Sequence, residues 1–133
     1  QLRVILAALG EALEAGEEDD LDPRVTRIVA VLHKEFHNPD LSIALLAAAA
    51  RVSPAHLFDL FKSATGGTIH RMLTEIRLEN ARALLGDGRY RIREVATMTG
   101  WRHPLYFSAA FRKRYGAAPS VFRGKRPGVI RAL

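Results

Sequence analysis

The chain has 133 residues, which is enough for one domain with its own core and a short appendage, but too few for two large domains. Hydrophobic residues make up 48% of the sequence, and no apolar run approaches the roughly 20 residues that cross a bilayer, so no membrane partner is expected. Cysteine is absent, which excludes disulfide frameworks, thiol catalysis and thiolate metal sites and is compatible with a cytoplasmic protein.

The net charge of +6 is distributed unevenly along the chain. Residues 1–22 carry −6, residues 23–88 carry +2, and residues 89–133 carry +10, with eleven bases and one acid, Glu94. A positive field of this kind favours polyanions, of which nucleic acid is the commonest in solution. A solvated basic tail is the alternative that charge alone leaves open.

The first 22 residues are predicted to form an appendage in two parts. Apolar residues recur at helical spacing in the first part, and they are Leu2, Ile5, Leu6, Leu9 and Leu13. We therefore expect an amphipathic helix over residues 2–15, followed by an acidic linker from Glu17 to Asp22. Because Gln1 stands inside the apolar pattern, without an initiator methionine or a signal-type segment, we interpret the chain as a fragment of a longer protein.

A helix is predicted next, over residues 23–36. Asp22 supplies its N-cap and Pro23 its first-turn residue, and the sequence Asn38-Pro39-Asp40 ends it. One face of this helix is apolar and consists of Val25, Ile28, Val29, Leu32 and Phe36.

Two further helices complete a first helix-turn-helix segment, residues 23–67. The first of them is a short alanine-rich helix from about Ser42 to Ala50, and the second begins at Ser53-Pro54 and ends at Gly66-Gly67. The inward residues of the second are expected to be Leu57, Leu60, Phe61 and Ala64. Two helices joined by a turn of three or four residues indicate a helix-turn-helix.

A long helix from Thr68 to about Leu85 is predicted to connect this segment with the rest of the chain. Thr68 is its expected N-cap, and Gly86-Asp87-Gly88 ends it, so that the connecting segment covers residues 68–88. Its inward residues are expected to be Met72, Leu73, Ile76, Ala83 and Leu84. No strand pattern of useful length occurs in the sequence, so the predicted fold is all-α.

The first helix-turn-helix pattern recurs over residues 89–124. Leu46-Ala47 reappears as Val95-Ala96 at an offset of 49 residues. At an offset of 50 residues, Leu57, Phe61, Lys62 and Gly66 reappear as Phe107, Phe111, Arg112 and Gly116. Gly100-Trp101 stands where the second turn must bend and fill the core. The repeat predicts a second helix-turn-helix, followed by a basic tail, residues 125–133.

A family pattern is spread over about residues 23–124. Up to the end of the long helix it consists of Leu46-Ala47, Ser53, Leu57, Leu60-Phe61-Lys62, Gly66, Arg77-Leu78, Ala81 and Leu84-Leu85. Beyond that helix it consists of Ile92, Glu94-Val95-Ala96, Gly100-Trp101, Tyr106-Phe107-Ser108, Phe111-Arg112-Lys113, Gly116, Pro119-Ser120 and Phe122-Arg123. In these residues and their spacing the chain resembles the AraC/XylS family of bacterial transcription regulators.

The resemblance implies a seven-helix DNA-binding domain, with two helix-turn-helix units joined by one long central helix. It implies double-stranded DNA as a partner, read by the second helix of each unit in the major groove, and RNA polymerase as a further partner. It also implies an upstream ligand-sensing or dimerising domain, connected through the segment 2–15. No cofactor is predicted.

Helical geometry predicts which side chains of the two recognition helices face DNA. In the first they are Ala55, Phe58, Asp59 and Lys62, with Ser53 at the helix start, and in the second they are Leu105, Ser108, Ala109 and Arg112. The family often has arginine where this chain has Asp59 and Ala109, so those base contacts are not expected here. Apolar groups can meet thymine methyl groups instead, and a carboxylate can accept from cytosine N4.

Further basic side chains near the second recognition helix are predicted phosphate contacts. Lys113 follows Arg112, Arg102 lies in the preceding turn, and Arg91 and Arg93 flank the start of the helix before it. A plain surface role is the alternative for each of them. The aromatic residues of this region are interpreted as core, and they are Trp101, Phe107, Phe111 and Phe122.

Other chemistry has little support in the sequence. His33 and His37 have a spacing that can hold a metal, but no third ligand is evident, so we interpret them as a solvated helix end. No metal site and no enzyme activity are predicted, because neither a triad nor a polar cluster for catalysis is recognisable. A protein-interaction module on the same fold, with weak or lost DNA affinity, is the alternative function, supported by Phe58, Asp59, Leu105 and Ala109.

Overall fold

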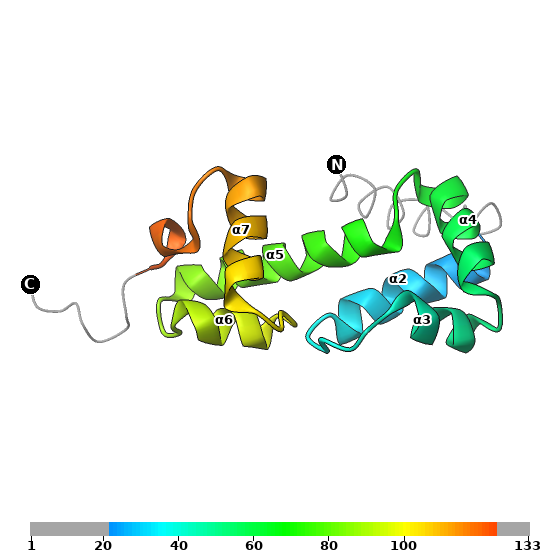
Figure 1. The fold of residues 1–133 in the computed structure, drawn as a ribbon, viewed down its shortest axis with the longest axis horizontal. Coiled ribbons are helices and arrows are strands. Elements are labelled where there is room, and N and C mark those ends of the chain that lie inside the picture. The colour runs from blue at the N-terminus through cyan, green and yellow to red at the C-terminus, as the bar shows by residue number, and fades with distance from the viewer. Residues whose placement is uncertain (1–21, 125–133) are drawn as a thin grey trace, which may run out of the picture. The chain divides into compact units, whose positions relative to one another are not determined.

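Capping residues and apolar stripes divide the chain into helices (Figure 1). The computed structural model describes residues 22–124, which form six α-helices and one 3₁₀-helix, with no strand among them. The helices are α2 (Pro23–Glu35), α3 (Ile43–Ala50), α4 (Pro54–Thr65), α5 (Ile69–Asp87), α6 (Ile92–Met98), α7 (Pro104–Tyr115) and the 3₁₀-helix Pro119–Phe122. The all-α prediction is confirmed, whereas the count of seven helices stays a prediction. The predicted helix 2–15, the acidic linker up to residue 21 and the tail 125–133 lie outside the described residues.

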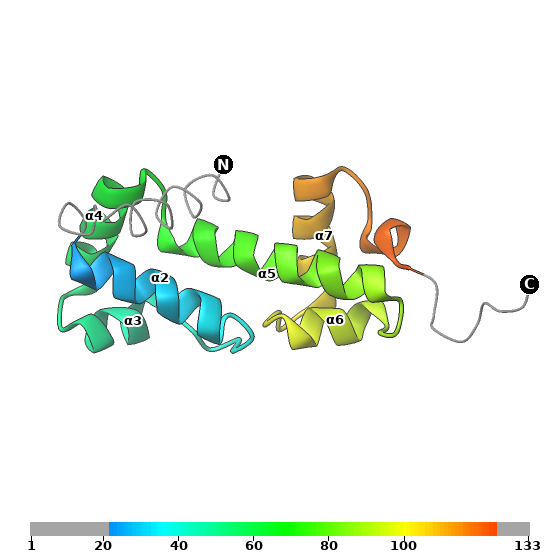
Figure 2. The same cartoon turned by 180° about the vertical axis from the view of Figure 1, so that it is seen from behind.

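The described residues form two compact units that share α5 (Figure 2). The first unit contains α2, α3, α4 and α5 up to Glu75, and the second contains α5 from Ile76 onward, α6 and α7. The loop Phe36–Pro39, which follows α2, also belongs to the second unit. Each unit therefore has one helix-turn-helix and one part of the long helix.

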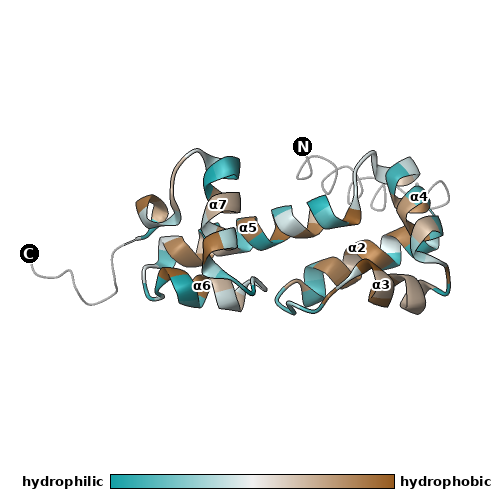
Figure 3. Ribbon diagram, viewed as in Figure 1, coloured by the Kyte–Doolittle hydropathy of each residue, from teal (hydrophilic) through white to brown (hydrophobic). Residues whose placement is uncertain are grey.

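The core of the first unit is built from the apolar stripes of its helices. Its buried residues include Val25, Ile28, Leu32, Leu46, Ala47, Leu57, Phe61, Ile69, Met72 and Leu73. Hydroxyl groups cap the two short helices, because Ser42 accepts from the backbone N–H of Leu45 at 3.2 Å and Ser53 accepts from that of His56 at 3.1 Å. Figure 3 shows that α3 is hydrophobic along its length.

Asp22 begins the first unit as the predicted cap of α2. Its side chain accepts a hydrogen bond from the backbone N–H of Arg24 at 2.8 Å, and the two side chains form an ion pair at 2.7 Å. The hydrogen bonds from Arg24 lower the pKa of Asp22 to about 2. The carboxylate is therefore held ionised at the start of the helix, where the helix dipole favours negative charge.

The prediction that two alanines point inward is wrong. Ala64 on α4 and Ala83 on α5 are exposed. The larger residues Phe61 and Leu85 are fully buried and set the rotation of these helices, so the alanines are turned outward.

Two helix ends differ slightly from the prediction. Helix α2 ends at Glu35, one residue earlier than expected, and α5 continues to Asp87. The continuation occurs because Gly86 is helical, and Gly88, with φ of 81°, is the residue that leaves the helix.

Aromatic rings dominate the core of the second unit. Phe107 and Phe111 are fully buried with their ring centroids 5.7 Å apart. The Trp101 ring lies 5.7 Å from Phe107, and the Phe122 ring lies 5.2 Å from Phe111, so all four rings belong to the core, as predicted. Pairs at these separations stabilise a core beyond the area that they bury.

A close contact fixes the turn between α6 and α7. Gly100 has φ of 92°, and a Cβ at this position would collide with the carbonyl oxygen of Phe36 and the guanidinium of Arg77. Arg77 donates from Nε to the carbonyl of Phe36 at 2.8 Å and from Nη2 to that of Asn38 at 2.8 Å. Glycine is therefore required at position 100 by both backbone conformation and space. Burial of the Arg77 guanidinium lowers its pKa.

No single helix within residues 22–124 is long and apolar enough to cross a membrane. Helices α3 and α4, which are bent by 89° relative to each other, are long and apolar enough for a membrane span only when the two are counted together, and only by length and composition.

Candidate nucleic-acid interface

Helix α4 has one buried and one exposed side. Leu57 and Phe61 are fully buried, and this fixes the rotation of the helix. The four residues predicted to face DNA are all exposed, and they are Ala55, Phe58, Asp59 and Lys62. Ser53, predicted at the helix start, is exposed and serves as the N-cap.

The exposed face of α4 combines charges of both signs with an aromatic ring. The ammonium of Lys62 lies 5.7 Å from the centroid of the Phe58 ring, within the range of a cation–π contact. Phe58 is 41% exposed and thus presents much of its ring to solvent. Asp59 adds a carboxylate that opposes the approach of phosphate and can accept from a base amino group.

Helix α7 repeats α4 at both ends with an offset of 50 residues. Both helices begin at a proline and end before a glycine in the left-handed region, Gly66 with φ of 79° and Gly116 with φ of 83°. In each case the glycine N–H donates to the carbonyl four residues earlier, at 2.8 Å. The predicted repeat of the two hairpins is therefore confirmed.

The face of α7 predicted to meet DNA is turned outward. Leu105 is 82% exposed, Ala109 and Arg112 are exposed, and Ser108 is half-buried. As in α4, this face has its cation near the end of the helix, but it has Ala109 where α4 has the carboxylate of Asp59.

Tyr106 is a candidate that the sequence analysis missed. It is 68% exposed, and its ring lies 5.2 Å from that of His103 in an edge-to-face arrangement. Its position three residues before Ala109, on the same side of a helix, was the signal that would have found it.

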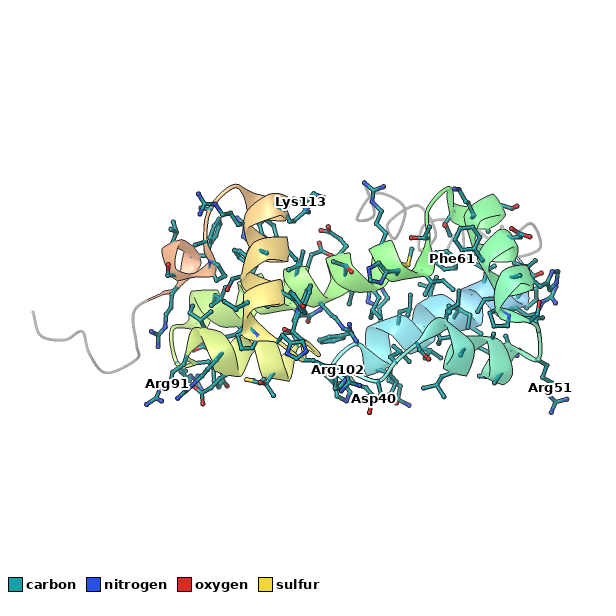
Figure 4. The ribbon with its side chains drawn as sticks, in the orientation of Figure 1. Asp40, Arg51, Phe61, Arg91, Arg102 and Lys113 are labelled. Carbon is teal, nitrogen blue, oxygen red and sulfur yellow. The ribbon has the colours of Figure 1, made fainter. Side chains whose placement is uncertain are left out.

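The remaining predicted phosphate contacts are exposed around the second helix-turn-helix. These residues are Arg91, Arg93, Arg102 and Lys113. Figure 4 shows the side chains of Arg91 and Lys113 directed away from the ribbon. These four basic side chains lie on or beside α6 and α7.

The start of α6 differs from the prediction in one respect. The backbone N–H of Arg91 donates to a carboxylate oxygen of Glu94 at 2.8 Å. A carboxylate of the chain therefore occupies this first turn and satisfies one of its free N–H groups. A phosphate contact at this place depends on the side chains of Arg91 and Arg93 and not on the helix end alone.

The described residues contain no group of three or more side chains suited to hold a metal ion. His33 lies in α2, whereas His37 lies beyond the end of that helix, with its ring 6.0 Å from that of Phe36. The two histidines thus lose the common helical face on which their spacing depended.

Comparison with known proteins gives the same family as the sequence pattern. A family model described as a helix-turn-helix domain matches residues 46–125, more than half of the chain. The chain is 30% identical over 122 residues to the arabinose operon regulatory protein of Escherichia coli (strain K12), an alignment that covers 92% of the chain and 42% of that protein. The chain spans less than half the length of the curated relatives it matches.

Two solved structures resemble the fold closely. The C-terminal domain of AraT, a response regulator from Geobacillus stearothermophilus, has a TM-score of 0.77 at 31% identity, covering 85% of this chain and 95% of that one. The DNA-binding domain of the global transcriptional factor AdpA, in complex with a target DNA, has a TM-score of 0.70 at 29% identity, covering 74% and 88%.

The matched family consists of DNA-binding domains and not of enzymes, which agrees with the prediction from the sequence. The repeated hairpins, the outward faces of α4 and α7 and these matches lead to one assignment. The chain belongs to the AraC/XylS family of transcription regulators and contains the DNA-binding domain of that family.

Proposed function

We propose that the chain binds double-stranded DNA by sequence and so regulates transcription, with α4 and α7 as recognition helices in adjacent segments of the major groove. The observation that carries the proposal is that each helix buries two large side chains and exposes the opposite face. In a helix-turn-helix, the second helix lies in the major groove and its first residues meet base edges. A solved relative of this fold is in complex with its target DNA.

The predicted contact residues divide into base-facing and phosphate-facing groups. The base-facing group consists of Ser53, Ala55, Phe58, Asp59, Leu105, Ser108 and Ala109. The phosphate-facing group consists of Lys62, Arg91, Arg93, Arg102, Arg112 and Lys113. Phosphate contacts set orientation and give salt-dependent affinity, and base contacts give specificity.

Selection of binding sites from a random DNA library with the full chain tests this proposal. The selected DNA and a scrambled duplex of equal composition are then titrated by fluorescence anisotropy at two salt concentrations. We expect the selected DNA to bind about 10³-fold more tightly. Equal affinity for the two duplexes would contradict sequence-specific binding.

The partners and location of the intact protein are part of the same proposal. The family resemblance supports an upstream ligand-sensing or dimerising domain, joined through an amphipathic helix over residues 2–15. It also supports RNA polymerase as a partner on the promoter. A regulator that acts on promoters of a bacterial chromosome works in the cytoplasm.

A second candidate function is binding of another protein through α4. Phe58 is 41% exposed beside the carboxylate of Asp59, a combination that suits a protein surface better than a phosphate backbone. The library selection separates the two functions, because only DNA binding enriches a sequence.

A further inference from the structure

The first half of α7 presents aliphatic side chains where a recognition helix meets base edges. Leu105 is 82% exposed, and Ala109, one helical turn later, is exposed on the same side. From Pro104 to Phe111 the sequence has no charged side chain and no side-chain amide. The groups that ordinarily read guanine and adenine, which are arginine, lysine, asparagine and glutamine, are therefore missing from these two turns.

The core prevents this face from turning inward. Phe107 and Phe111 are both fully buried, and the Phe107 ring contacts Trp101 and Phe111 with centroid separations of 5.7 Å in each case. Rotating α7 to bury Leu105 would expose these rings, at a much larger loss of buried apolar area. Leu105 and Ala109 are thus held in a fixed outward position.

Base-edge chemistry then decides which base suits the face. Guanine, adenine and cytosine present only hydrogen-bonding groups in the major groove, whereas thymine adds an apolar methyl group at C5. An aliphatic side chain leaves a donor or acceptor without a partner, but against a methyl group it buries apolar surface. We propose that α7 selects thymine, through contacts of Leu105 and Ala109 with thymine C5 methyl groups.

This inference rests on the proposed function and assigns it a base specificity in one recognition helix. The repeat makes α7 distinct in this respect, because Asp59 of α4 corresponds to Ala109 at the offset of 50 residues. The carboxylate gives α4 a different surface from the aliphatic one of α7. Thymine readout of this kind is therefore a property of the second unit.

Replacement of thymine by deoxyuridine removes the C5 methyl group and keeps the hydrogen-bonding groups of the base. The DNA selected from the random library is prepared with this replacement at each thymine in turn, and affinity for the full chain is measured by fluorescence anisotropy. We expect a loss of about fourfold at one or two positions, which is the effect of one buried methyl group.

Variants assign the methyl contact to a side chain. Leu105→Ala should bring the thymine-to-uridine affinity ratio close to one at one position, with the helical fold checked by circular dichroism. Val121→Ala is the matched control, because Val121 is an apolar residue 71% exposed in the same unit but outside α7. This control should keep the ratio of the parent chain. Leu105→Gln should shift the base preference from thymine to adenine, since glutamine pairs with adenine N6 and N7.

The outcomes separate the inference from the proposed function. Specific binding with equal affinity for thymine and uridine at every position would overturn the inference and leave the proposed function intact. A thymine preference that both Leu105 variants keep at every position would overturn the assignment of a methyl contact to Leu105. Failure to bind any DNA by sequence would overturn the proposed function itself.

Discussion

Arg112 on α7 and Asp59 on α4 have opposite charges, so one attracts DNA phosphates and the other repels them. Arg112 is exposed near the end of α7, where a guanidinium can meet a phosphate oxygen. Asp59 is exposed in the middle of α4, where a carboxylate near phosphates is repelled unless it accepts a hydrogen bond from a base. The two residues therefore contribute to affinity in ways that substitution can separate.

Arg112→Ala should reduce the dependence of affinity on salt. A lost phosphate contact releases about one counterion fewer, so the slope of log affinity against log salt should fall by up to about one unit. The slope is obtained from anisotropy titrations at several salt concentrations. Arg71→Ala is a matched control, since Arg71 is an exposed arginine of α5 outside both recognition helices, and it should keep the parent slope. An unchanged slope for Arg112→Ala would assign Arg112 to the solvated surface.

Asp59→Ala tests whether the carboxylate reads a base or only repels DNA. If it accepts from cytosine N4, base preference at one position should relax by about 1–3 kcal/mol while the fold is kept. If it only repels phosphate, affinity should rise for all sequences alike, and Asp59→Arg should raise it further. Asp59→Asn is the control for side-chain size, because it removes the charge and keeps the size of the side chain. The readout is affinity across a set of single-base variants of the selected DNA.

At the scale of elements, the repeat explains why so much of the fold is readable from the sequence. Each helix-turn-helix has serine or proline at a helix start, glycine at a helix end and two large apolar residues one turn apart, and these local signals predict α4 and α7 correctly. Errors arise where the relative size of nearby apolar residues decides which of them is buried. Ala64 and Ala83 face outward because bulkier neighbours fill the core, and a pattern of apolar residues does not rank them by size.

Within the site, outward positions were predicted from the sequence, but side-chain contacts were not. The outward positions of Leu105, Ala109 and Asp59 follow from helical periodicity alone and are confirmed as exposed. Two features were not readable, namely the edge-to-face contact of Tyr106 with His103 and the bond from the Arg91 N–H to Glu94. Both depend on side-chain conformations that residue spacing does not determine.

Gly100→Ala should destabilise the turn between α6 and α7. The substitution places a Cβ against the Phe36 carbonyl and the Arg77 guanidinium and forces a non-glycine residue to φ of 92°, so a loss of about 1–3 kcal/mol in unfolding free energy is expected. Gly86→Ala is the matched control, because Gly86 is helical and has no atom within 4 Å of an added Cβ. It should be stabilising by roughly 0.5–1 kcal/mol. Urea denaturation measures both, and equal stability of the two variants would contradict this explanation of the turn.

At the scale of the whole chain, the two ends carry net charges of opposite sign. Residues 89–133 carry +10 and residues 1–22 carry −6, so the acidic segment is tethered to a basic DNA-binding domain. Of the seven acids at the start of the chain, Asp22 is engaged with Arg24 at the start of α2. The other six are the ones that would compete with DNA for the basic surface.

Removal of residues 1–21 should strengthen nonspecific DNA binding, mostly at low salt. The truncation stops before Asp22 because this residue caps α2, and its loss would change stability as well as charge. Competition between tethered acids and phosphates is screened as ionic strength rises, so the gain in affinity should disappear at high salt. A full-length variant with amides in place of the six acids is the control for chain length. The same affinity with and without residues 1–21 would show that the segment is only a linker.

The hydrogen bonds from Arg77 to the loop Phe36–Pro39 limit which parts of the chain can be isolated as stable fragments. This loop precedes α3 in the chain, yet it belongs to the second unit, so the residues of that unit are not contiguous in sequence. A fragment that begins at the long helix loses both carbonyl acceptors and leaves a partly buried guanidinium without them, a costly state for a charged group. Isolating the second helix-turn-helix as a stable fragment would therefore require either new acceptors for Arg77 or replacement of this arginine.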